Sequence, residues 1–380
     1  MALPAATTGG GRFSPGIALG RFAAGGGGCY WPRTSGTSPG EMAEEKVMAA
    51  AEGLEILAIG NAIVDVVARA GEDFLAHHGM RKGTMRLIET EEAERLYAAM
   101  PPGQESSGGS AANTAAVAAL AGARAGFVGK VASDQLGAVF AHDIRAAGVR
   151  FTTLPLVGGV PTARSLILVT PDGQRTMNTY LGAAIAFSDE DLDPAEIAAA
   201  GVLYLEGYLF DPPAAQQAFR RAAAIARRAG RRVALSLSDP FCVERHRPAF
   251  LELIRDGVDI LFANEAEVCS LFETGHFEIA AAAARQAAPL IALTRSERGS
   301  VVLAGVESIV VPPEPTIVVD TTGAGDAYAA GFLAALAAGR GLASAGRMGS
   351  IAAAAAIAQL GARPHTDLRL RLTALEEAGG

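Results

Sequence analysis

Short apolar runs that alternate with longer, helix-length segments are the feature of this sequence that most limits its fold. Runs typical of buried strands occupy residues 54–60, 202–205, 233–237, 260–263, 290–293 and 316–319. Helix-length segments lie between them, for example residues 213–229 and 247–256. Strand, helix and strand at this spacing predict right-handed crossovers and a parallel sheet that helices cover on both faces. The sequence therefore predicts a doubly wound α/β core.

Two regions interrupt this alternation, residues 64–88 and 149–181. They contain strand-like segments too close together for helical crossovers, and Pro171-Asp172-Gly173 separates two of these, residues 163–169 and 175–180. An Asp-Gly turn between alternating β-branched residues is typical of a β-hairpin. We therefore predict a small separate sheet at the edge of the core, which would act as a lid that excludes water from a reaction.

The first 50 residues differ in composition from the rest of the chain. Residues 1–40 contain no Asp or Glu, carry three arginines and include two glycine tracts. Such a segment buries too little apolar surface to fold, so we predict a disordered, low-complexity tail over residues 1–50 and one folded domain over residues 54–376. A misassigned start, with Met42 or Met48 as the true first residue, is our preferred interpretation. A transit peptide and a functional tail are the alternatives.

The charge and the cysteines limit the partners. A net charge of -8 argues against a nucleic-acid-binding surface, which needs a clustered excess of Lys and Arg. Cys29, Cys242 and Cys269 are widely spaced and form no zinc-binding motif. No apolar run reaches the roughly 18 residues of a membrane span without Gly, charge or turn signals. We predict a cytoplasmic protein, monomer or homodimer, with neither nucleic acid nor membrane as partner.

The sequence Val-Val-Asp-Thr-Thr-Gly-Ala-Gly-Asp at residues 318–326 is the most informative motif. It reads as a strand, a glycine-rich turn and the start of a helix. The backbone N–H groups of Gly323, Ala324 and Gly325 would point outward, with the positive end of the helix dipole behind them, and so form an anion hole. Asp326 would lie in the first helical turn, beside a transferring phosphate, and could accept the proton of an acceptor hydroxyl. The alternative is that Asp326 only caps the helix.

A second glycine-rich element, Ser-Gly-Gly-Ser-Ala-Ala-Asn at residues 107–113, also opens an Ala-rich helix. With Asp134 and Gly137 downstream it resembles the first signature of the ribokinase-like (PfkB) kinase family, and residues 320–331 resemble the second. The resemblance extends over about residues 54–365. It implies transfer of the γ-phosphate of ATP to a hydroxymethyl group of a nucleoside or sugar, with Mg²⁺ as cofactor, and assigns Asp326 as the base rather than a cap.

Further residues follow from the same resemblance. Asn264 and Glu267 look like the family's NxxE motif, which organises magnesium and phosphates through water. Arg175 is similar to the lid arginine that reaches the phosphates, although an exposed hairpin arginine is usually only solvated. Thr294 and Gly299 stand in the loop near the adenine of ATP, where Ser296 replaces the family's glycine.

The predicted acceptor site resembles adenosine kinases more than ribokinases or fructokinases. A carboxylate can accept hydrogen bonds from two vicinal ribose hydroxyls, which suits Asp65, although a structural role is the alternative. Tyr208 could stack on a base or line the core. The residues that carry this resemblance are Asn61, Asp65, Gly108, Gly109, Ser110, Asn113 and Tyr208.

The spacing of glycines in this sequence does not fit the motifs of two other nucleotide-binding folds. A P-loop that ended at Gly129-Lys130 would need glycine in place of Arg124 and Ser or Thr in place of Val131. Residues 60–65 after the first predicted strand do not read GxGxxG, so the dinucleotide fingerprint is absent.

Three classes of function stay open: an adenosine or other PfkB-type sugar or nucleoside kinase, a nucleoside-sensing binding protein, and a structural or interaction protein. The intact turn and Asp326 favour the kinase.

Overall fold

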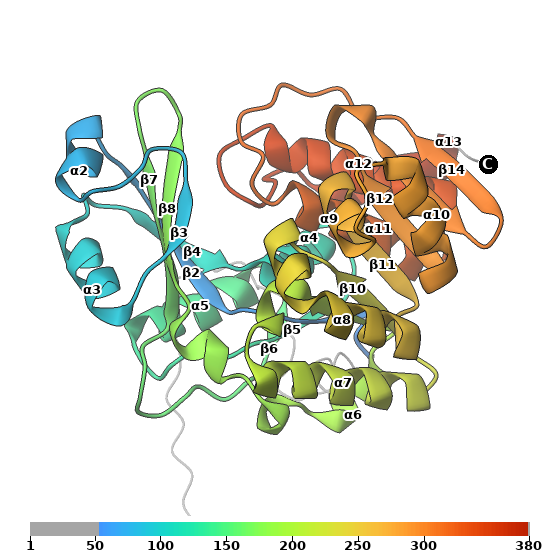
Figure 1. The fold of residues 1–380 in the computed structure, drawn as a ribbon, viewed down its shortest axis with the longest axis horizontal. Coiled ribbons are helices and arrows are strands. Elements are labelled where there is room, and N and C mark those ends of the chain that lie inside the picture. The colour runs from blue at the N-terminus through green and yellow to red at the C-terminus, as the bar shows by residue number, and fades with distance from the viewer. Residues whose placement is uncertain (1–52, 379–380) are drawn as a thin grey trace, which may run out of the picture. The chain divides into compact units, whose positions relative to one another are not determined.

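The computed structural model describes residues 53–378, and the predicted tail over residues 1–50 lies outside the described residues. Two sheets organise this part of the chain (Figure 1). The larger has nine strands in the order β14-β13-β12-β11-β10-β9-β1-β5-β6. Their bounds are β1 Ile56–Ile59, β5 Ala125–Val128, β6 Arg150–Phe151, β9 Val202–Glu206, β10 Arg232–Ser236, β11 Ile260–Asn264, β12 Leu290–Thr294, β13 Ser300–Ala304 and β14 Glu307–Val311.

The larger sheet is parallel except at one edge. The pairs from β6 to β12 are all parallel, whereas β13 and β14 add antiparallel strands at the edge. Every residue of β1 and β9 is buried, as expected for parallel strands covered on both faces. The predicted doubly wound α/β fold is confirmed.

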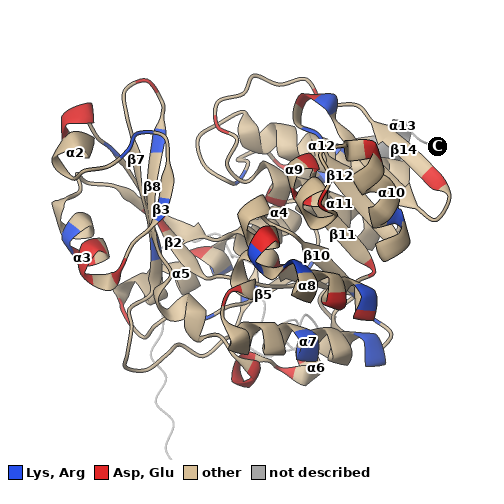
Figure 2. Ribbon diagram, viewed as in Figure 1, with Lys and Arg blue, Asp and Glu red and all other residues tan. Residues whose placement is uncertain are grey.

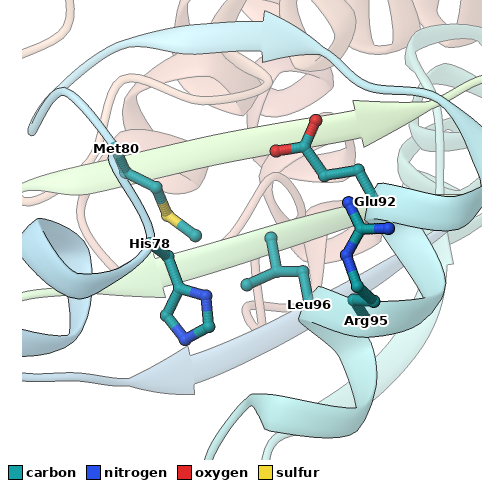
Figure 3. A pocket seen from close by; sticks show the side chains of 5 residues that line it. All are labelled: His78, Met80, Glu92, Arg95 and Leu96. Atoms are coloured by element: carbon teal, nitrogen blue, oxygen red, sulfur yellow. The ribbon is translucent and has the colours of Figure 1, made fainter.

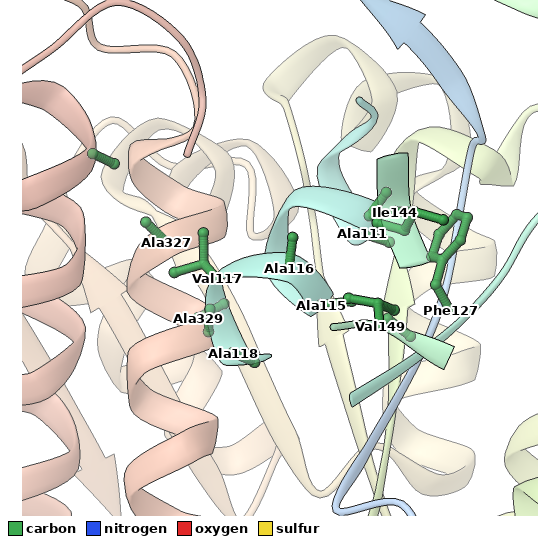
Figure 4. Packing of buried hydrophobic residues seen from close by; sticks show 14 of the residues in the cluster. Ala111, Ala115, Ala116, Val117, Ala118, Phe127, Ile144, Val149, Ala327 and Ala329 are labelled. Carbon is green, nitrogen blue, oxygen red and sulfur yellow. The ribbon is translucent and has the colours of Figure 1, made fainter. Parts of the chain in front are cut away.

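Helices cover both faces of this sheet and enclose two apolar cores. One core contains residues of α4 (Ser110–Leu120), α5 (Gln135–Ala146), α11 (Ala324–Ala337), α12 (Leu342–Ile357) and α13 (Leu368–Ala378). The other contains residues of α6 (Pro194–Ala199), α7 (Pro213–Arg228), α8 (Pro240–Gly257), α9 (Glu265–Leu271) and α10 (Phe277–Ala287). Figure 4 shows α4 beside α11, with small side chains such as Ala116, Val117, Ala327 and Ala329 near the contact. Alanine lets the two helix backbones approach closely.

The smaller sheet has the order β3-β8-β7-β2-β4, and its bounds are β2 Ile63–Arg69, β3 Met85–Leu87, β4 Gln104–Gly108, β7 Ala163–Val169 and β8 Arg175–Tyr180. The helices α2 (Glu72–His77) and α3 (Thr90–Ala99) pack on one face. The sequence did not indicate β4, because its residues Gln-Glu-Ser-Ser-Gly lack an apolar pattern. Within the predicted lid region 149–181, β6 instead joins the larger sheet.

The strand predicted over residues 316–319 is absent, and that prediction was wrong. Ile317, Val318 and Val319 stand exposed in an extended loop between β14 and α11. The backbone N–H groups of Val319 and Asp320 donate to the carbonyl of Ile357, at the end of α12, instead of to a strand. An apolar β-branched run has strand propensity, but it forms a strand only where a neighbouring strand supplies the ladder.

The charged side chains are spread over the described elements. Figure 2 shows Lys and Arg scattered among Asp and Glu on the helices and loops of both sheets. Among residues 53–378, no helix is both long enough and apolar enough to cross a membrane.

Candidate active site

The order of the strands reverses between β1 and β9, since the chain runs from β1 to one side of the sheet and later returns to the other. Open α/β sheets bind ligands beyond the carboxyl ends of the strands at such a point. Here Asn61 follows β1, and its backbone N and Nδ2 donate to Glu206 Oε1 at 3.2 and 2.7 Å. Ala111 N donates to Glu206 Oε2 at 2.6 Å. Glu206 therefore joins both strand ends to the start of α4.

Glu206 is a site residue to which sequence reasoning assigned no role. It is 1% exposed, and its burial raises its pKa to about 7. A Glu at the end of a wholly apolar strand was the available signal. Because the Nδ2 of Asn61 is occupied by Glu206, Asn61 has only part of its carboxamide left for the acceptor contact predicted from sequence.

Asp326 lies in the first turn of α11 and faces the start of α4. Ser110 Oγ donates to Asp326 Oδ1 at 2.5 Å, and Asn113 Nδ2 lies 3.5 Å from Oδ2. The structure thus brings together the two glycine-rich elements, which are more than 200 residues apart in the sequence. Burial raises the pKa of Asp326 to about 6, while its two hydrogen bonds oppose the rise.

The turn ahead of Asp326 has different requirements at its two glycines. Gly323 is the N-cap of α11 with φ +73°, and a Cβ there would lie 2.4 Å from the carbonyl oxygen of Ala362. Gly325 has open space where a Cβ would be. Fold geometry explains Gly323, since only glycine fits that left-handed position. It leaves Gly325 unexplained, and an open approach to the backbone N–H groups is what an anion would need.

Arg175 extends from β8 to the same turn. Its Nη2 lies 2.7 Å from Asp320 Oδ2, and Nη1 donates to Thr322 Oγ1 at 3.4 Å. Asp320 also accepts from Thr322 N and from Gly361 N, at 3.1 and 2.8 Å. The guanidinium is therefore not a solvated hairpin side chain. It connects the smaller sheet to the glycine-rich turn.

Asp65 lies on β2, on the face of the smaller sheet that carries Arg175. A Cβ at Gly108, which pairs with Ile63, would lie 2.3 Å from the Asp65 carboxylate, so a larger residue there would displace the Asp65 side chain. A Cβ at Gly109, with φ +97°, would lie 2.1 Å from the carbonyl of Asn61. Burial raises the pKa of Asp65 to about 6, and nearby Asp326 adds to the rise.

A cation near both carboxylates was also missed from the sequence. Arg363 follows α12, and its charge lowers the pKa of Asp65 and of Asp326. Its Nε donates to Asn113 Oδ1 at 2.9 Å and its Nη1 donates to Ser107 Oγ at 3.0 Å. A single Arg after a helix, within Gly-Ala-Arg-Pro, gave no pattern from which to predict this position.

Asn264 and Glu267 form a capping box at the start of α9. Asn264 N donates to Glu267 Oε2 at 2.9 Å, Asn264 Nδ2 donates to Oε1 at 2.5 Å, and Glu267 N donates to Asn264 Oδ1 at 2.9 Å. Burial raises the pKa of Glu267 to about 7, and Asp239 and Asp326 add to it. Among the described residues, no three His, Cys, Asp or Glu side chains group as metal ligands.

The remaining predicted residues lie around this centre. Tyr208 is 41% exposed in the turn after β9, and its pKa is raised by burial and by carboxylates that include Asp326. Thr294 ends β12. Gly299 has φ +76° and a Cβ there would lie 2.1 Å from the carbonyl of Val311, so the turn itself requires this glycine.

Two cavities in the described chain lie away from these residues. One of about 160 Å³ lies between the end of α2 and α3 and is lined by His78, Met80, Glu92, Arg95 and Leu96 (Figure 3). The other, of about 590 Å³, lies at the C-terminal ends of α4 and α5. This is the end of α4 that is far from Ser110. Neither contains a carboxylate or glycine of the centre around Asp326.

Comparison with known proteins identifies the family of this chain. Residues 83–368 match the profile of the pfkB family carbohydrate kinases. The chain belongs to this family. Its predicted fold class, its family and its class of enzyme, a phosphotransferase with an alcohol acceptor, are confirmed.

Individual relatives include both nucleoside and sugar kinases. The adenosine kinase of Sinorhizobium meliloti is 51% identical, with a TM-score of 0.78, and the match covers 86% of this chain and 99% of that one. A probable sugar kinase from Rhizobium etli is 47% identical, with a TM-score of 0.78, and covers 86% and 98%. The ATP-dependent ribose-1-phosphate kinase of Halopiger xanaduensis is 31% identical over 66% of this chain and 80% of its own length.

Proposed function

We propose that this kinase transfers the γ-phosphate of ATP to the 5′-hydroxyl of adenosine and forms AMP, with Mg²⁺ as cofactor. One observation carries the proposal. Asp326 stands behind the open turn at Gly325 and is held by Ser110, while Asp65 lies near it on the smaller sheet. The arrangement offers a base for a hydroxyl, an anion-binding turn for a phosphate, and a second carboxylate for the rest of the acceptor.

The chemistry needs a proton acceptor and a site for negative charge. Asp326 would take the proton of the acceptor hydroxyl while the hydroxyl oxygen attacks the γ-phosphorus of ATP. The bond between the γ-phosphorus and the bridging β-phosphate oxygen breaks, and ADP leaves. The N–H groups of Gly323, Ala324 and Gly325 would stabilise the transferring phosphate. Arg175, now paired with Asp320, lies close enough to this turn to exchange the carboxylate for phosphate oxygens.

The face of the smaller sheet around Asp65 favours a nucleoside over a bare sugar. Strand register places Leu87, Thr179 and Ser165 in one row with Asp65, and the next row contains Met85, Met177, Ile167 and Val67. Met85 and Leu87 are 52% and 60% exposed. If Asp65 accepts hydrogen bonds from the ribose hydroxyls, these apolar side chains would cover the base. Tyr208 could also contact the ring from the other side of the site.

A sugar kinase is the second candidate. Its acceptor would be ribose, fructose or another nucleoside. The printed names of the Rhizobium etli relative, a probable sugar kinase, and the Halopiger relative, a ribose-1-phosphate kinase, support a sugar or sugar phosphate as acceptor. The 51% identical adenosine kinase and the apolar face beside Asp65 favour adenosine. A sugar would leave that apolar face uncovered.

Asn264 and Glu267 fit an outer-sphere role toward Mg²⁺. Each Glu267 oxygen already accepts one hydrogen bond within the capping box and keeps further lone pairs for water. Magnesium in such sites retains several waters and neutralises the phosphate charge. We therefore assign both residues to the metal's water ligands and not to the metal itself.

The adenine of ATP would lie near Thr294, at the end of β12, and Gly299, after the short turn that follows, as the family resemblance predicts. ATP as the donor also favours the predicted cytoplasmic location.

A phosphorylation screen tests the proposal. The protein is incubated with ATP and Mg²⁺ and with adenosine, ribose or fructose in parallel, and products are identified by mass. We expect kcat/KM to be highest for adenosine, with AMP as the product. A higher kcat/KM for ribose or fructose would show that the protein is a sugar kinase and not an adenosine kinase. Phosphorylation of none would refute the proposed chemistry.

A further inference from the structure

The fold does not require an arginine at position 363. It lies in the connection between α12 and α13, six residues after the helix ends at Ile357. Its side chain is only 18% exposed and turns inward to the start of α4. A connection of this kind can be closed by many residue types, so the buried charge calls for a separate reason.

The three side-chain nitrogens of Arg363 differ in their contacts: Nε and Nη1 have hydrogen-bond partners, and Nη2 has none among the described residues. Nε binds Asn113 Oδ1, and Nη1 binds Ser107 Oγ. Asp143 Oδ2 lies 3.5 Å from Nη1 and also accepts from the backbone N of Ser107 at 2.8 Å. Nη2 is buried and has no hydrogen-bond partner among the described residues. The guanidinium is thus held at Nε and Nη1, and Nη2 is left without a partner among the described residues.

The bond to Asn113 fixes which way that carboxamide faces. An amide has one accepting oxygen and one donating nitrogen. Because Arg363 Nε donates to Oδ1, Asn113 must present Nδ2 to the other side, where Asp326 Oδ2 lies at 3.5 Å. Arg363 and Asp326 favour the same orientation of this amide, and without Arg363 only the long 3.5 Å contact with Asp326 would hold it.

Arg363 is also the cation whose charge acts on both site carboxylates. Among the described residues, the charge of Asp326 raises the pKa of five acidic or phenolic neighbours: Asp65 on β2, Tyr204 and Glu206 on β9, Tyr208 after β9 and Glu267 on α9. The burial of Asp326 itself disfavours its ionised form, and the charge of Arg363 opposes this effect, since it lowers the pKa of Asp326.

We propose that Arg363 is a positioning residue of the acceptor site, which orients Asn113 toward Asp326, places a positive charge beside the two site carboxylates and offers Nη2 to an oxygen of the acceptor. This role rests on the proposed function of Asp326 as the base. It requires an acceptor rich in oxygen, a ribose or another polyol, because the free donor is buried and finds no partner among the described residues.

The test compares Arg363→Gln, Arg363→Lys and the control Arg369→Gln, which changes an exposed arginine on α13. Two readouts are used: the pH dependence of kcat/KM for adenosine, and the titration of the Asp326 carboxyl by ¹³C NMR, assigned by its loss in Asp326→Asn. For Arg363→Gln we expect kcat/KM for adenosine to fall about ten-fold to a hundred-fold, the loss typical of a charged hydrogen bond. The acid limb and the Asp326 titration should both move to higher pH, and KM for ATP should stay unchanged.

Arg363→Lys keeps the charge but lacks the planar fork that binds two acceptors. Its Asp326 titration should remain at the wild-type pH while kcat/KM for adenosine still falls. If Arg363→Gln lowers only Tm and leaves both the acid limb and the titration unchanged, Arg363 is structural and the proposal is wrong. If the Gln variant does not fold, the Lys variant decides, because a wild-type kcat/KM there overturns the proposal.

The NMR titration separates this inference from the proposed function. It needs neither ATP nor an acceptor, so it reports on Arg363 even if the wild-type protein fails to phosphorylate adenosine. Failure of phosphorylation by the wild type would refute the substrate. An unchanged titration in Arg363→Gln would refute the positioning role.

Discussion

Arg175 and Asp320 form an ion pair of 2.7 Å between the smaller sheet and the glycine-rich turn, with side chains only 11% and 6% exposed. Asp320 keeps three other donors, from Thr322 N, Thr322 Oγ1 and Gly361 N. The carboxylate therefore remains hydrogen-bonded if the arginine leaves. If Arg175 binds phosphate, as we propose, Asp320 is not left without hydrogen-bond donors.

Arg175→Gln should lower kcat more than it raises KM for ATP. The reason is that the guanidinium would stabilise charge on the transferring phosphate, an interaction that strengthens in the transition state. Steady-state kinetics with both substrates measures the effect, which we expect to be about ten-fold or more, as for one charged hydrogen bond. Arg86→Gln is the matched control, because Arg86 lies on the same sheet but pairs with Glu92. Equal losses in both variants would assign Arg175 to sheet stability alone.

Asp326→Asn should abolish most turnover while it preserves the fold. General-base catalysis contributes about 10² to 10⁴ in rate, so kcat should fall by at least about 10² with little change in KM. Retention of more than about a tenth of wild-type kcat would exclude Asp326 as the base. In the wild type, kcat/KM should decline as the pH falls through about 6, where Asp326 takes up its proton.

The same substitution should raise thermal stability at neutral pH. The pKa of Asp326 rises from 3.8 to about 6 on folding, so the native state binds the proton more tightly than the unfolded state. The stability linked to this group is complete at pH values below the unfolded pKa and is lost as the pH rises through the folded pKa. Tm of Asp326→Asn should exceed that of the wild type at pH 7.5 and match it below about pH 4. A lower Tm at pH 7.5 would contradict burial as the cause.

Gly323 and Gly325 should respond differently to alanine. A Cβ at Gly323 would clash with the Ala362 carbonyl at 2.4 Å, so Gly323→Ala should lower Tm and activity together. Gly325 lies in the helix with open space around it, so Gly325→Ala should raise stability by about 0.5 to 1 kcal/mol. Its methyl group would nevertheless obstruct the phosphate and raise KM for ATP. Thermal melts measure the stability of both variants, and steady-state kinetics measures their KM for ATP. An unchanged KM for ATP in Gly325→Ala would show that the phosphate does not bind at this turn.

Asp65→Ala should impair the acceptor and spare ATP. Loss of a hydrogen-bonded partner costs roughly 1 to 3 kcal/mol, about ten-fold to a hundred-fold in KM for adenosine. The control is 2′,3′-dideoxyadenosine, which lacks the ribose hydroxyls, so its KM should be the same in the variant and the wild type. If KM for both nucleosides rises equally, Asp65 does not recognise the hydroxyls.

The sequence by itself determined the fold class, the family and the turn before Asp326. Each depends on local order along the chain: apolar runs at strand and helix spacing, and glycines ahead of a helix. It also gave a false strand at residues 316–319, since local propensity cannot show that no neighbouring strand is there to pair with it.

The tertiary structure decided how these segments meet. The bond between Ser110 and Asp326 exists because α4 and α11 pack side by side, and the contact between Arg175 and Asp320 exists because β8 belongs to a sheet that faces the turn. Glu206 stands in the stretch before Tyr208 that resembles adenosine kinases but was assigned no role, and Arg363 lies outside any motif that we could interpret. Only the convergence of strand ends and a helix connection places both beside the site. A sequence pattern records neighbours along the chain, whereas burial, charge coupling and hydrogen bonding depend on neighbours in space.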